Sequence, residues 1–170
     1  MKHNQGITLI ELLVSMSIMV IFASVVLTGF RRQPPEAALE QSAMEVRSAI
    51  LTARNLALAP QTKYAAPAGG GAPAKYFAAK ITKINGSNIV EVIKYDSDGI
   101  PSSLSGYSKT LPSKINISDW EVKFEVAASV ISFDPPTNSI DITHSDITDR
   151  KATISVDRVT GYTDITIQQP

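Results

Sequence analysis

The residues of this sequence that could take part in chemistry stand close to its amino terminus. Gly6, Ile7 and Thr8 open an apolar run, and Glu11 is the only charged side chain between Ile7 and Phe30. A carboxylate inside a membrane helix costs about 2–3 kcal/mol, so it usually has a partner. That partner can lie in the same chain or in a neighbouring chain.

A purely local role for Glu11 is also open. Thr8-Leu9-Ile10-Glu11 has the spacing of a capping box, in which Thr8 caps the helix and Glu11 accepts a hydrogen bond from the Thr8 backbone N–H. Short motifs of this kind have many false matches. On the residues alone, the capping role and the pairing role of Glu11 are both open.

The composition of the 170 residues argues against an enzyme. The chain has no cysteine and two histidines, of which only His144 lies outside the first five residues. These counts remove disulfides, thiolate metal sites and thiol catalysis, and they leave little material for histidine acid–base chemistry. Sixteen basic and sixteen acidic residues give a net charge of zero, which is atypical of a protein that binds polyanions. We expect no catalytic residues, no cofactor and no metal.

The first element that positions the amino-terminal residues is the apolar run itself. Residues 7–30 form a helix of roughly 36 Å, which is long enough to cross a bilayer. The run is longer than the apolar part of a secretory signal, and no small-residue cleavage site stands near Phe30. Arg31 and Arg32 end the run. The sequence thus predicts a membrane-anchored protein whose folded part lies beyond Arg32.

An amphipathic helix segment is expected over residues 31–59. The Pro34-Pro35 pair interrupts the first helical pattern, and proline is favourable in the first turn of a new helix. Beyond it, apolar residues recur at steps of three and four, which predicts a helix that packs one face on a sheet. Pro60 ends this helix, and the Ala/Gly/Pro-rich stretch 65–74 reads as a loop.

From Lys75 onward the apolar pattern changes to the alternation that is typical of β-strands. The strongest signal is Asn85-Gly86, which predicts a two-residue hairpin turn between the first two strands. Trp120 is expected in the core. The predicted fold class is α+β, with a long membrane-spanning and amphipathic amino-terminal helix packed on an antiparallel, β-rich domain of residues 60–170. We expect strands at 76–84, 88–95, 121–126, 130–133, 140–143, 152–159 and 162–167.

Two places have residue types that bind metal ions in other proteins. Residues 95–99 resemble the start of a calcium-binding loop. The twelfth position of such a loop, counted from Asp96, is Tyr107 instead of glutamate, so we expect a turn. His144 and Asp146, with Asp149 nearby, are the other place. A polar turn between two strands accounts for these residues without a metal.

The residues from Gly6 to Val14, Gly-Ile-Thr-Leu-Ile-Glu-Leu-Leu-Val, resemble the class III signal of type IV prepilins and pseudopilins. In that family a membrane aspartic peptidase cuts after the glycine and methylates the new amino terminus. The resemblance implies a leader of residues 1–6, cleavage between Gly6 and Ile7, and N-methylation of Ile7. Many members have phenylalanine where this chain has Ile7. The cut leaves an ammonium group on Ile7, one helical turn from Glu11 and on the same helix face, so the two charges can pair within one chain or between neighbouring chains. Assembly is assigned to Glu11, the fifth residue of the mature chain, together with Thr8. The fold that the resemblance implies is pilin-like.

The same resemblance implies a structural role in a filament. Residues 7–30 would form the membrane anchor and then the filament core, while the β-rich domain faces outward. The implied partners are other pilin or pseudopilin subunits, the prepilin peptidase, an inner-membrane platform protein, an assembly ATPase, and membrane lipid before assembly. The implied location is the inner (cytoplasmic) membrane, as a single-pass protein, and then a periplasmic or cell-surface filament.

Two stretches resemble GspH/FimT-like minor pilins in particular. These are Ala53–Ala57, at the end of the second helical segment, and the final hairpin, from Ile154 through Gly161 to Ile165. They favour a minor pilin or pseudopilin of a type IV pilus or a type II secretion-like filament.

Two alternatives remain open for the function. One is a permanently anchored single-pass protein that displays a β-rich binding domain. The other is a DNA-uptake minor pilin, since some FimT-like proteins bind DNA through arginines near the carboxyl end. The tail after Gly161 has no arginine, and Arg150, Lys151 and Arg158 stand among aspartates, so we do not expect DNA binding.

Overall fold

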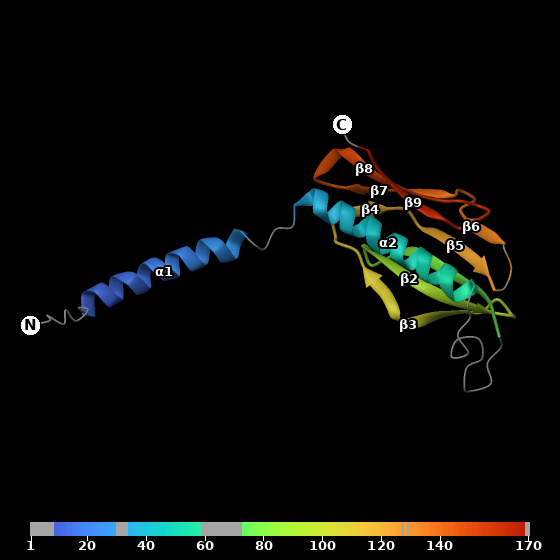
Figure 1. Ribbon diagram of the computed structural model, residues 1–170, viewed down its shortest axis with the longest axis horizontal. Coiled ribbons are helices and arrows are strands. Elements are labelled where there is room, and N and C mark those ends of the chain that lie inside the picture. The colour runs from blue at the N-terminus through green and yellow to red at the C-terminus, as the bar shows by residue number, and fades with distance from the viewer. Residues whose placement is uncertain (1–8, 30–33, 59–72, 127, 129, 169–170) are drawn as a thin grey trace, which may run out of the picture. The chain divides into compact units, whose positions relative to one another are not determined.

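The computed structural model describes residues 9–29, 34–58, 73–126, 128 and 130–168, with no side-chain detail for residues 25–29. The chain forms two compact units, Met1–Pro34 and Pro35–Pro170. The described part of the first unit is helix α1 (Leu9–Gly29). The described elements of the second unit are one helix and two β-sheets (Figure 1).

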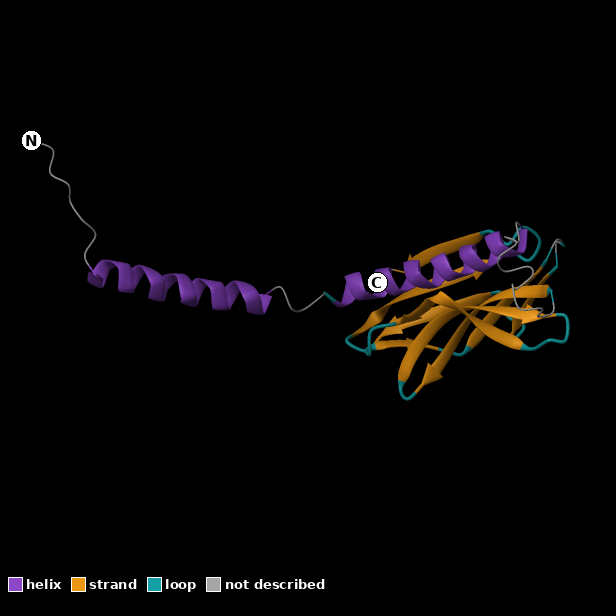
Figure 2. Cartoon of the chain, turned by 90° about the horizontal axis from the view of Figure 1, so that it is seen from below, coloured by secondary structure: helices purple, strands orange, loops and turns teal. Residues whose placement is uncertain are grey.

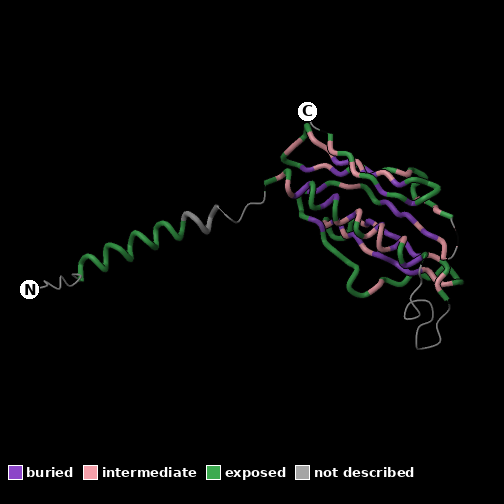
Figure 3. The backbone as a smooth tube through the Cα atoms, viewed as in Figure 1, coloured by how far each residue is buried: buried purple, intermediate pink, exposed green. Residues whose placement is uncertain are grey.

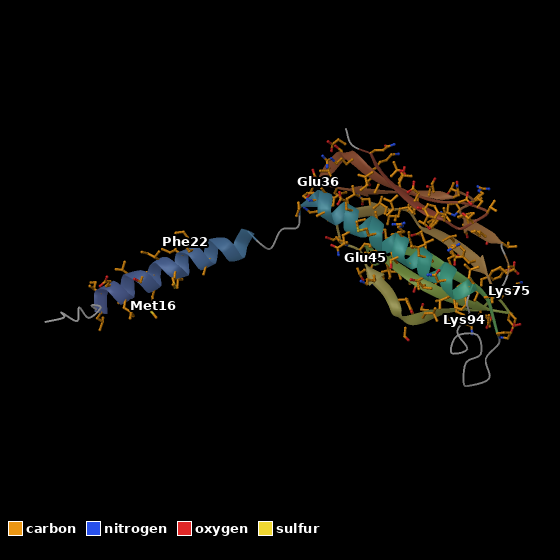
Figure 4. All side chains as sticks on the ribbon, viewed as in Figure 1. Met16, Phe22, Glu36, Glu45, Lys75 and Lys94 are labelled. Atoms are coloured by element: carbon orange, nitrogen blue, oxygen red, sulfur yellow. The ribbon has the colours of Figure 1, made fainter. Side chains whose placement is uncertain are left out.

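Helix α1 consists mostly of apolar residues, and Glu11 in its first turn is its one charged residue. Ser15 Oγ donates a hydrogen bond to the Glu11 backbone carbonyl at 2.7 Å, and two further serines bond back to the helix in the same way. Large side chains such as those of Met16 and Phe22 project outward from the helix and are exposed (Figure 4). A helix that satisfies its polar groups internally and presents apolar side chains all round suits an apolar environment.

Helix α2 (Pro35–Leu58) begins with proline in its first turn, as the sequence predicts. Its apolar side is buried, whereas a stripe that includes Met44 and Leu58 stays exposed (Figure 3). Ser42 is the one polar member of the buried side, and its hydroxyl donates to the Ala38 carbonyl at 2.7 Å. The buried residues of α2 are Ala38, Leu39, Ser42, Ala43, Val46, Ile50, Ala53, Leu56 and Ala57.

The strands of the second unit form two antiparallel sheets (Figure 2). The five-stranded sheet has the order β3-β2-β1-β5-β6 and the four-stranded sheet the order β4-β7-β8-β9. The first contains β1 (Ala74–Ile84), β2 (Ser87–Asp96), β3 (Pro101–Thr110), β5 (Trp120–Glu125) and β6 (Ile131–Asp134). The second contains β4 (Ile115–Ile117), β7 (Ser139–His144), β8 (Ile147–Val156) and β9 (Thr163–Gln168).

The core lies where α2 packs on one face of each sheet. Helix α2 contacts β1, β2 and β5 of the larger sheet and β7, β8 and β9 of the smaller one. Trp120 is buried as predicted, and its Nε1 donates to the Thr137 carbonyl at 3.0 Å. This arrangement confirms the α+β, pilin-like fold class. The largest fully buried apolar side chains of the two sheets are Phe77, Ile81, Val92, Val122, Ile115, Ile142, Ile154 and Val156.

The predicted strands agree with the structure in most places and differ in three. Asn85 and Gly86 form the predicted hairpin turn, with φ of 50° and 80°. Strands β3 and β4 were not predicted, because β3 is rich in serine and almost fully exposed, and β4 has only three residues. The strand predicted at 152–159 begins earlier and ends at Val156, since Asp157 and the residues after it form a turn.

Candidate functional site

The amino-terminal site is described only in part. Glu11 lies in the first turn of α1, and Gly6, Ile7 and Thr8 lie outside the described residues. The cleavage site, the methylated residue, the cap and the pairing of Glu11 with an amino terminus therefore stay predictions.

The described surface of α1 offers an almost continuous apolar covering around that single carboxylate. The large side chains from Leu9 to Phe22 are between about one half and four fifths exposed, with Ile18 at 48% and Leu9 at 82%. Exposed apolar patches of this size are typical of surfaces that contact other molecules. Across the stretches that the structure describes, no helix meets the length and apolar character needed to cross a membrane.

The end of α2 and the turn of the final hairpin, on which the predicted minor-subunit assignment depends, lie in contact with each other. Arg54 Nε, near the end of α2, donates to the Thr160 carbonyl at 3.0 Å, in the turn between β8 and β9. The next residue, Gly161, has a positive φ of 67°. A Cβ atom at Gly161 would lie 3.0 Å from Phe124 Cε1 and 3.1 Å from Arg54 Cδ, so only glycine fits here without a shift. Arg54 lies off the apolar stripe of its helix, and the sequence pattern alone did not show this contact.

The turn before Gly161 is organised by one carboxylate. Asp157 Oδ1 accepts hydrogen bonds from the Thr160 N–H at 2.7 Å, the Thr160 hydroxyl at 2.8 Å and the Val159 N–H at 3.0 Å. These bonds, led by that of the Thr160 N–H, lower the pKa of the Asp157 carboxyl. The turn is thus held in shape by its own residues before it meets α2.

The other end of α2 is also joined to the smaller sheet. Arg150, near the start of β8, lies with Nη1 3.1 Å from Oε1 of Glu36, which stands in the first turn of α2. A glutamate in a first helical turn also interacts favourably with the helix dipole. Arg54 donates a hydrogen bond to the β8–β9 turn of the same sheet. Polar contacts therefore join both ends of α2 to the smaller sheet.

The basic residues near the final hairpin all have partners within the second unit. Lys151 Nζ lies 3.0 Å from Asp141 Oδ2, in addition to the pair between Arg150 and Glu36. Arg158 Nη2 donates to the Pro136 carbonyl at 3.2 Å, and its guanidinium lies 5.8 Å from the centre of the Phe133 ring.

The predicted polar turn between two strands is present at Ser145 and Asp146, between β7 and β8, and His144 directly precedes it. His144 is the last residue of β7, it is 5% exposed, and its Nδ1 accepts the Asp146 N–H at 3.1 Å. Asp146 is at the turn and pairs with Lys114 Nζ at 2.6 Å, and that hydrogen bond lowers its pKa. In the described portion of the chain, no group of three or more histidine, aspartate or glutamate side chains could hold a metal ion.

One polar cluster on the outer face of the larger sheet was not predicted from the sequence. The Tyr95 hydroxyl donates to Glu121 Oε1 at 2.5 Å, and Lys123 Nζ lies 3.3 Å from Glu121 Oε2 and over the Tyr95 ring. Burial and this hydrogen bond raise the pKa of Tyr95 far above its usual value. The cluster joins β2 to β5 across β1, so its members are far apart in the sequence. Alternation of polar residues in these strands is the only signal that points to it.

Comparison with known proteins bears on the amino terminus. Residues 1–27 match the family described as the prokaryotic N-terminal methylation motif. The match includes the whole stretch from Gly6 to Glu11 and most of α1. Comparison with curated proteins and with solved structures found no match. The chain therefore carries the N-terminal methylation motif of type IV prepilin-like proteins, joined to a pilin-like α+β unit.

Proposed function

We propose that this protein is a structural subunit of a type IV pilus or of a related secretion pseudopilus. The observation that carries the proposal is the N-terminal methylation motif over residues 1–27, in which one carboxylate, Glu11, stands on an otherwise apolar helix. The second unit supports it, because it is a helix packed on antiparallel sheets with its own core, as an exported pilin domain requires.

Maturation is the first step of the proposed function. A prepilin peptidase cleaves the peptide bond after Gly6, releases residues 1–6, and methylates the new amino group of Ile7. The methylated amine remains a cation, so the mature chain begins with a positive charge four residues before the negative charge of Glu11. The leader Met-Lys-His-Asn-Gln-Gly is polar and basic, which favours its retention on the cytoplasmic side until cleavage.

Assembly is the second step. The exposed apolar side chains of α1 are covered by lipid before assembly and by the helices of neighbouring subunits in the filament. Glu11 accepts the Ile7 ammonium of a neighbour, with Thr8 beside it. A pair of opposite charges in apolar surroundings fixes the axial offset between two helices, because any other offset leaves both charges without a partner.

The partners and the location follow from that sequence of events. The subunit enters the inner membrane through residues 7–30 and is cleaved there. It is then moved into a periplasmic or cell-surface filament by a platform protein and an assembly ATPase. Other pilin or pseudopilin subunits are its neighbours in the filament.

Within the superfamily we propose a minor subunit of the GspH/FimT type. Support comes from the contact of Arg54 with Thr160 and Gly161, because it joins the two stretches of sequence that resemble those proteins. Glycine at position 161 and arginine at position 54 depend on each other, since the arginine side chain occupies the space that a Cβ atom would need.

The mass of the native amino terminus tests the proposal. We expect a mature chain that starts at a methylated Ile7 and co-purifies with sheared filaments. An intact Met1 on a protein that stays in the inner membrane would overturn the proposal and favour the permanently anchored binding protein. A mature terminus in a strain that lacks the prepilin peptidase would equally contradict it.

A further inference from the structure

We propose that two copies of the second unit pair through strand β9, edge to edge and antiparallel, so that their four-stranded sheets become one continuous sheet. The pairing goes beyond the assembly of α1 helices, because it uses a surface of Pro35–Pro170 alone. Strand β9 lies at the end of its sheet, and an edge strand presents a row of N–H and C=O groups that can pair with another chain.

The other three sheet edges carry features that hinder such pairing. Strand β3 begins with Pro101, and its register against β2 shifts between Glu91 and Ile93. Strand β4 has three residues, and strand β6 has four and runs into Pro135 and Pro136. Short edges, prolines and irregular register are the means by which natural sheets block the addition of a strand.

Over residues 163–168, strand β9 has none of these features, and the nearest proline of the sequence, Pro170, stands two residues beyond it. Strand β9 pairs with β8 in unbroken register, from Val156 opposite Thr163 to Lys151 opposite Gln168. Its sequence, Thr-Asp-Ile-Thr-Ile-Gln, consists mostly of β-branched residues and has no proline, lysine or arginine. Among the described residues, this edge is regular and has no further strand paired with it.

The rim beside β9 is also incompletely covered. Thr163 is fully buried on the face toward α2, whereas Ile165 and Ile167, on the same face, are only partly buried. Helix α2 contacts β9, and its exposed stripe includes Met44 at 62% and Leu58 at 58% exposure. A strand added to β9 extends the apolar face of the sheet, so it covers the rim that α2 leaves open.

A second copy of β9 fits this edge in both chemistry and register. In an antiparallel pair with the twofold axis at Ile165, that residue stands opposite the partner's Ile165, and Thr163 stands opposite the partner's Ile167. On the outer face, Asp164 stands opposite the partner's Thr166, so no like charges meet. Apolar residues thus share one face and polar residues the other. A twofold pair of this kind closes on itself and does not grow into a fibre.

Cysteine cross-linking of the full chain tests this register, since the natural sequence has no cysteine. Residues directly opposite in an antiparallel pair have Cα atoms about 4.5–5.5 Å apart, which is within the range of a disulfide. Under mild oxidation in membranes, we expect Ile165→Cys to give about tenfold more covalent dimer than Ser139→Cys. Ser139 is the matched control, because it is exposed at the start of β7 and away from the edge.

A second variant protects the test against a loss of folding, since Ile165 is partly buried. Asp164 and Thr166 are exposed, and the double variant Asp164→Cys/Thr166→Cys places each cysteine opposite the other cysteine of the partner. We expect covalent dimer from the double variant and little from either single variant. Equal cross-linking of Ser139→Cys, or no covalent dimer from both Ile165→Cys and the double variant, overturns the β9 pairing. The cross-link should persist in a Glu11→Gln background, so its failure is distinct from failure of the proposed assembly role.

Discussion

At the scale of single residues, Glu11 has two possible roles, as a helix cap or as an assembly residue. As a cap it acts within one helix, and an amide side chain at the same place could still accept the hydrogen bond. As an assembly residue it meets the Ile7 ammonium of a neighbour in apolar surroundings, where the charge itself matters. The loss of one partner of a buried ion pair costs about 3–5 kcal/mol, several times more than the loss of a surface pair.

The substitution Glu11→Gln separates these two accounts. We expect normal cleavage after Gly6 but a loss of this subunit from filaments, because the neutral amide leaves the Ile7 ammonium unpaired. Cleavage is read from the amino-terminal mass, and incorporation from the amount of subunit in sheared filaments. Ser17→Ala is the control, since that hydroxyl bonds only to its own helix, at the Leu13 carbonyl. Normal incorporation of Glu11→Gln would leave Glu11 as a cap.

Gly6 is the residue on which maturation depends. The peptidase has to bring the carbonyl of Gly6 close to its catalytic carboxylates, and a branched side chain at this position blocks that approach. We expect Gly6→Val to accumulate as full-length precursor in the membrane, visible as an amino-terminal mass that begins at Met1. Gln5→Val adds the same side chain one residue earlier and should be processed normally. Processed Gly6→Val would remove the main support for the proposed function.

At the scale of elements, the contact between α2 and the β8–β9 turn depends on Gly161. Alanine there combines an unfavourable positive φ with a clash against Phe124 and Arg54. Gly86 has a similar φ of 80°, but a Cβ atom there meets nothing within 4 Å, so Gly86→Ala measures the backbone cost alone. We expect Gly86→Ala to lower the free energy of unfolding by about 1–2 kcal/mol and Gly161→Ala by roughly 1–3 kcal/mol more. If denaturant titrations give the same loss of unfolding free energy for both variants, Phe124 and Arg54 can move to accept a Cβ atom at position 161.

The turn itself has a pH dependence whose sign follows from Asp157. The hydrogen bonds from Thr160 and Val159 lower the pKa of this carboxyl in the folded state. Its contribution to stability is therefore fully present above the unfolded value of about 3.9 and is lost as the pH falls through the lower folded value. We expect Asp157→Asn to be less stable than the natural chain at neutral pH, with the difference shrinking below about pH 4. A difference that stays constant with pH would show that the charge of Asp157 is unimportant.

Most elements could be predicted because their signals are local. The proline pair marks the start of α2, the apolar steps mark its buried side, and Asn85-Gly86 fixes the first hairpin. Strand β3 was missed because an exposed edge strand does not need the apolar alternation that reveals a half-buried strand. The end of β8 was misplaced because Val159 is apolar yet stands in the Asp157 turn, 77% exposed.

The contacts that join distant elements could not be predicted. Arg54 and Thr160 are separated by 106 residues, and Tyr95 and Glu121 by 26, so no local pattern connects them. The same limit applied to His144, because Ser145 and Asp146 form the predicted turn but the burial of His144 itself was not predicted. His144 ends β7 on the side of the buried Ile140 and Ile142 and pairs with Ile115 of β4, so its burial depends on residues that are distant in the sequence. The amino-terminal motif was recognised because its residues are contiguous and act together.

At the scale of the whole molecule, the two units have opposite relations to water. Helix α1 exposes its apolar side chains, whereas the second unit buries its own around α2. The core of the second unit contains side chains from α2, from β1, β2 and β5, and from β4, β7 and β8. Because α2 supplies the face that both sheets cover, the sheets have no common core without it. The stability of the second unit should therefore depend on α2 and not on α1.

The fragment of residues 35–170 tests this division of the molecule. We expect it to be soluble and to unfold in one cooperative transition, because all members of its core lie within the fragment. Circular dichroism and tryptophan fluorescence of Trp120 should report the same denaturant midpoint, since that side chain is buried between β1 and β6. A shorter fragment that begins at Pro73 and lacks α2 is the matched control and should not fold. A broad transition, or two different midpoints, would mean that the sheets require α1 or a neighbouring subunit for their stability, and the exported unit would then be complete only inside the filament.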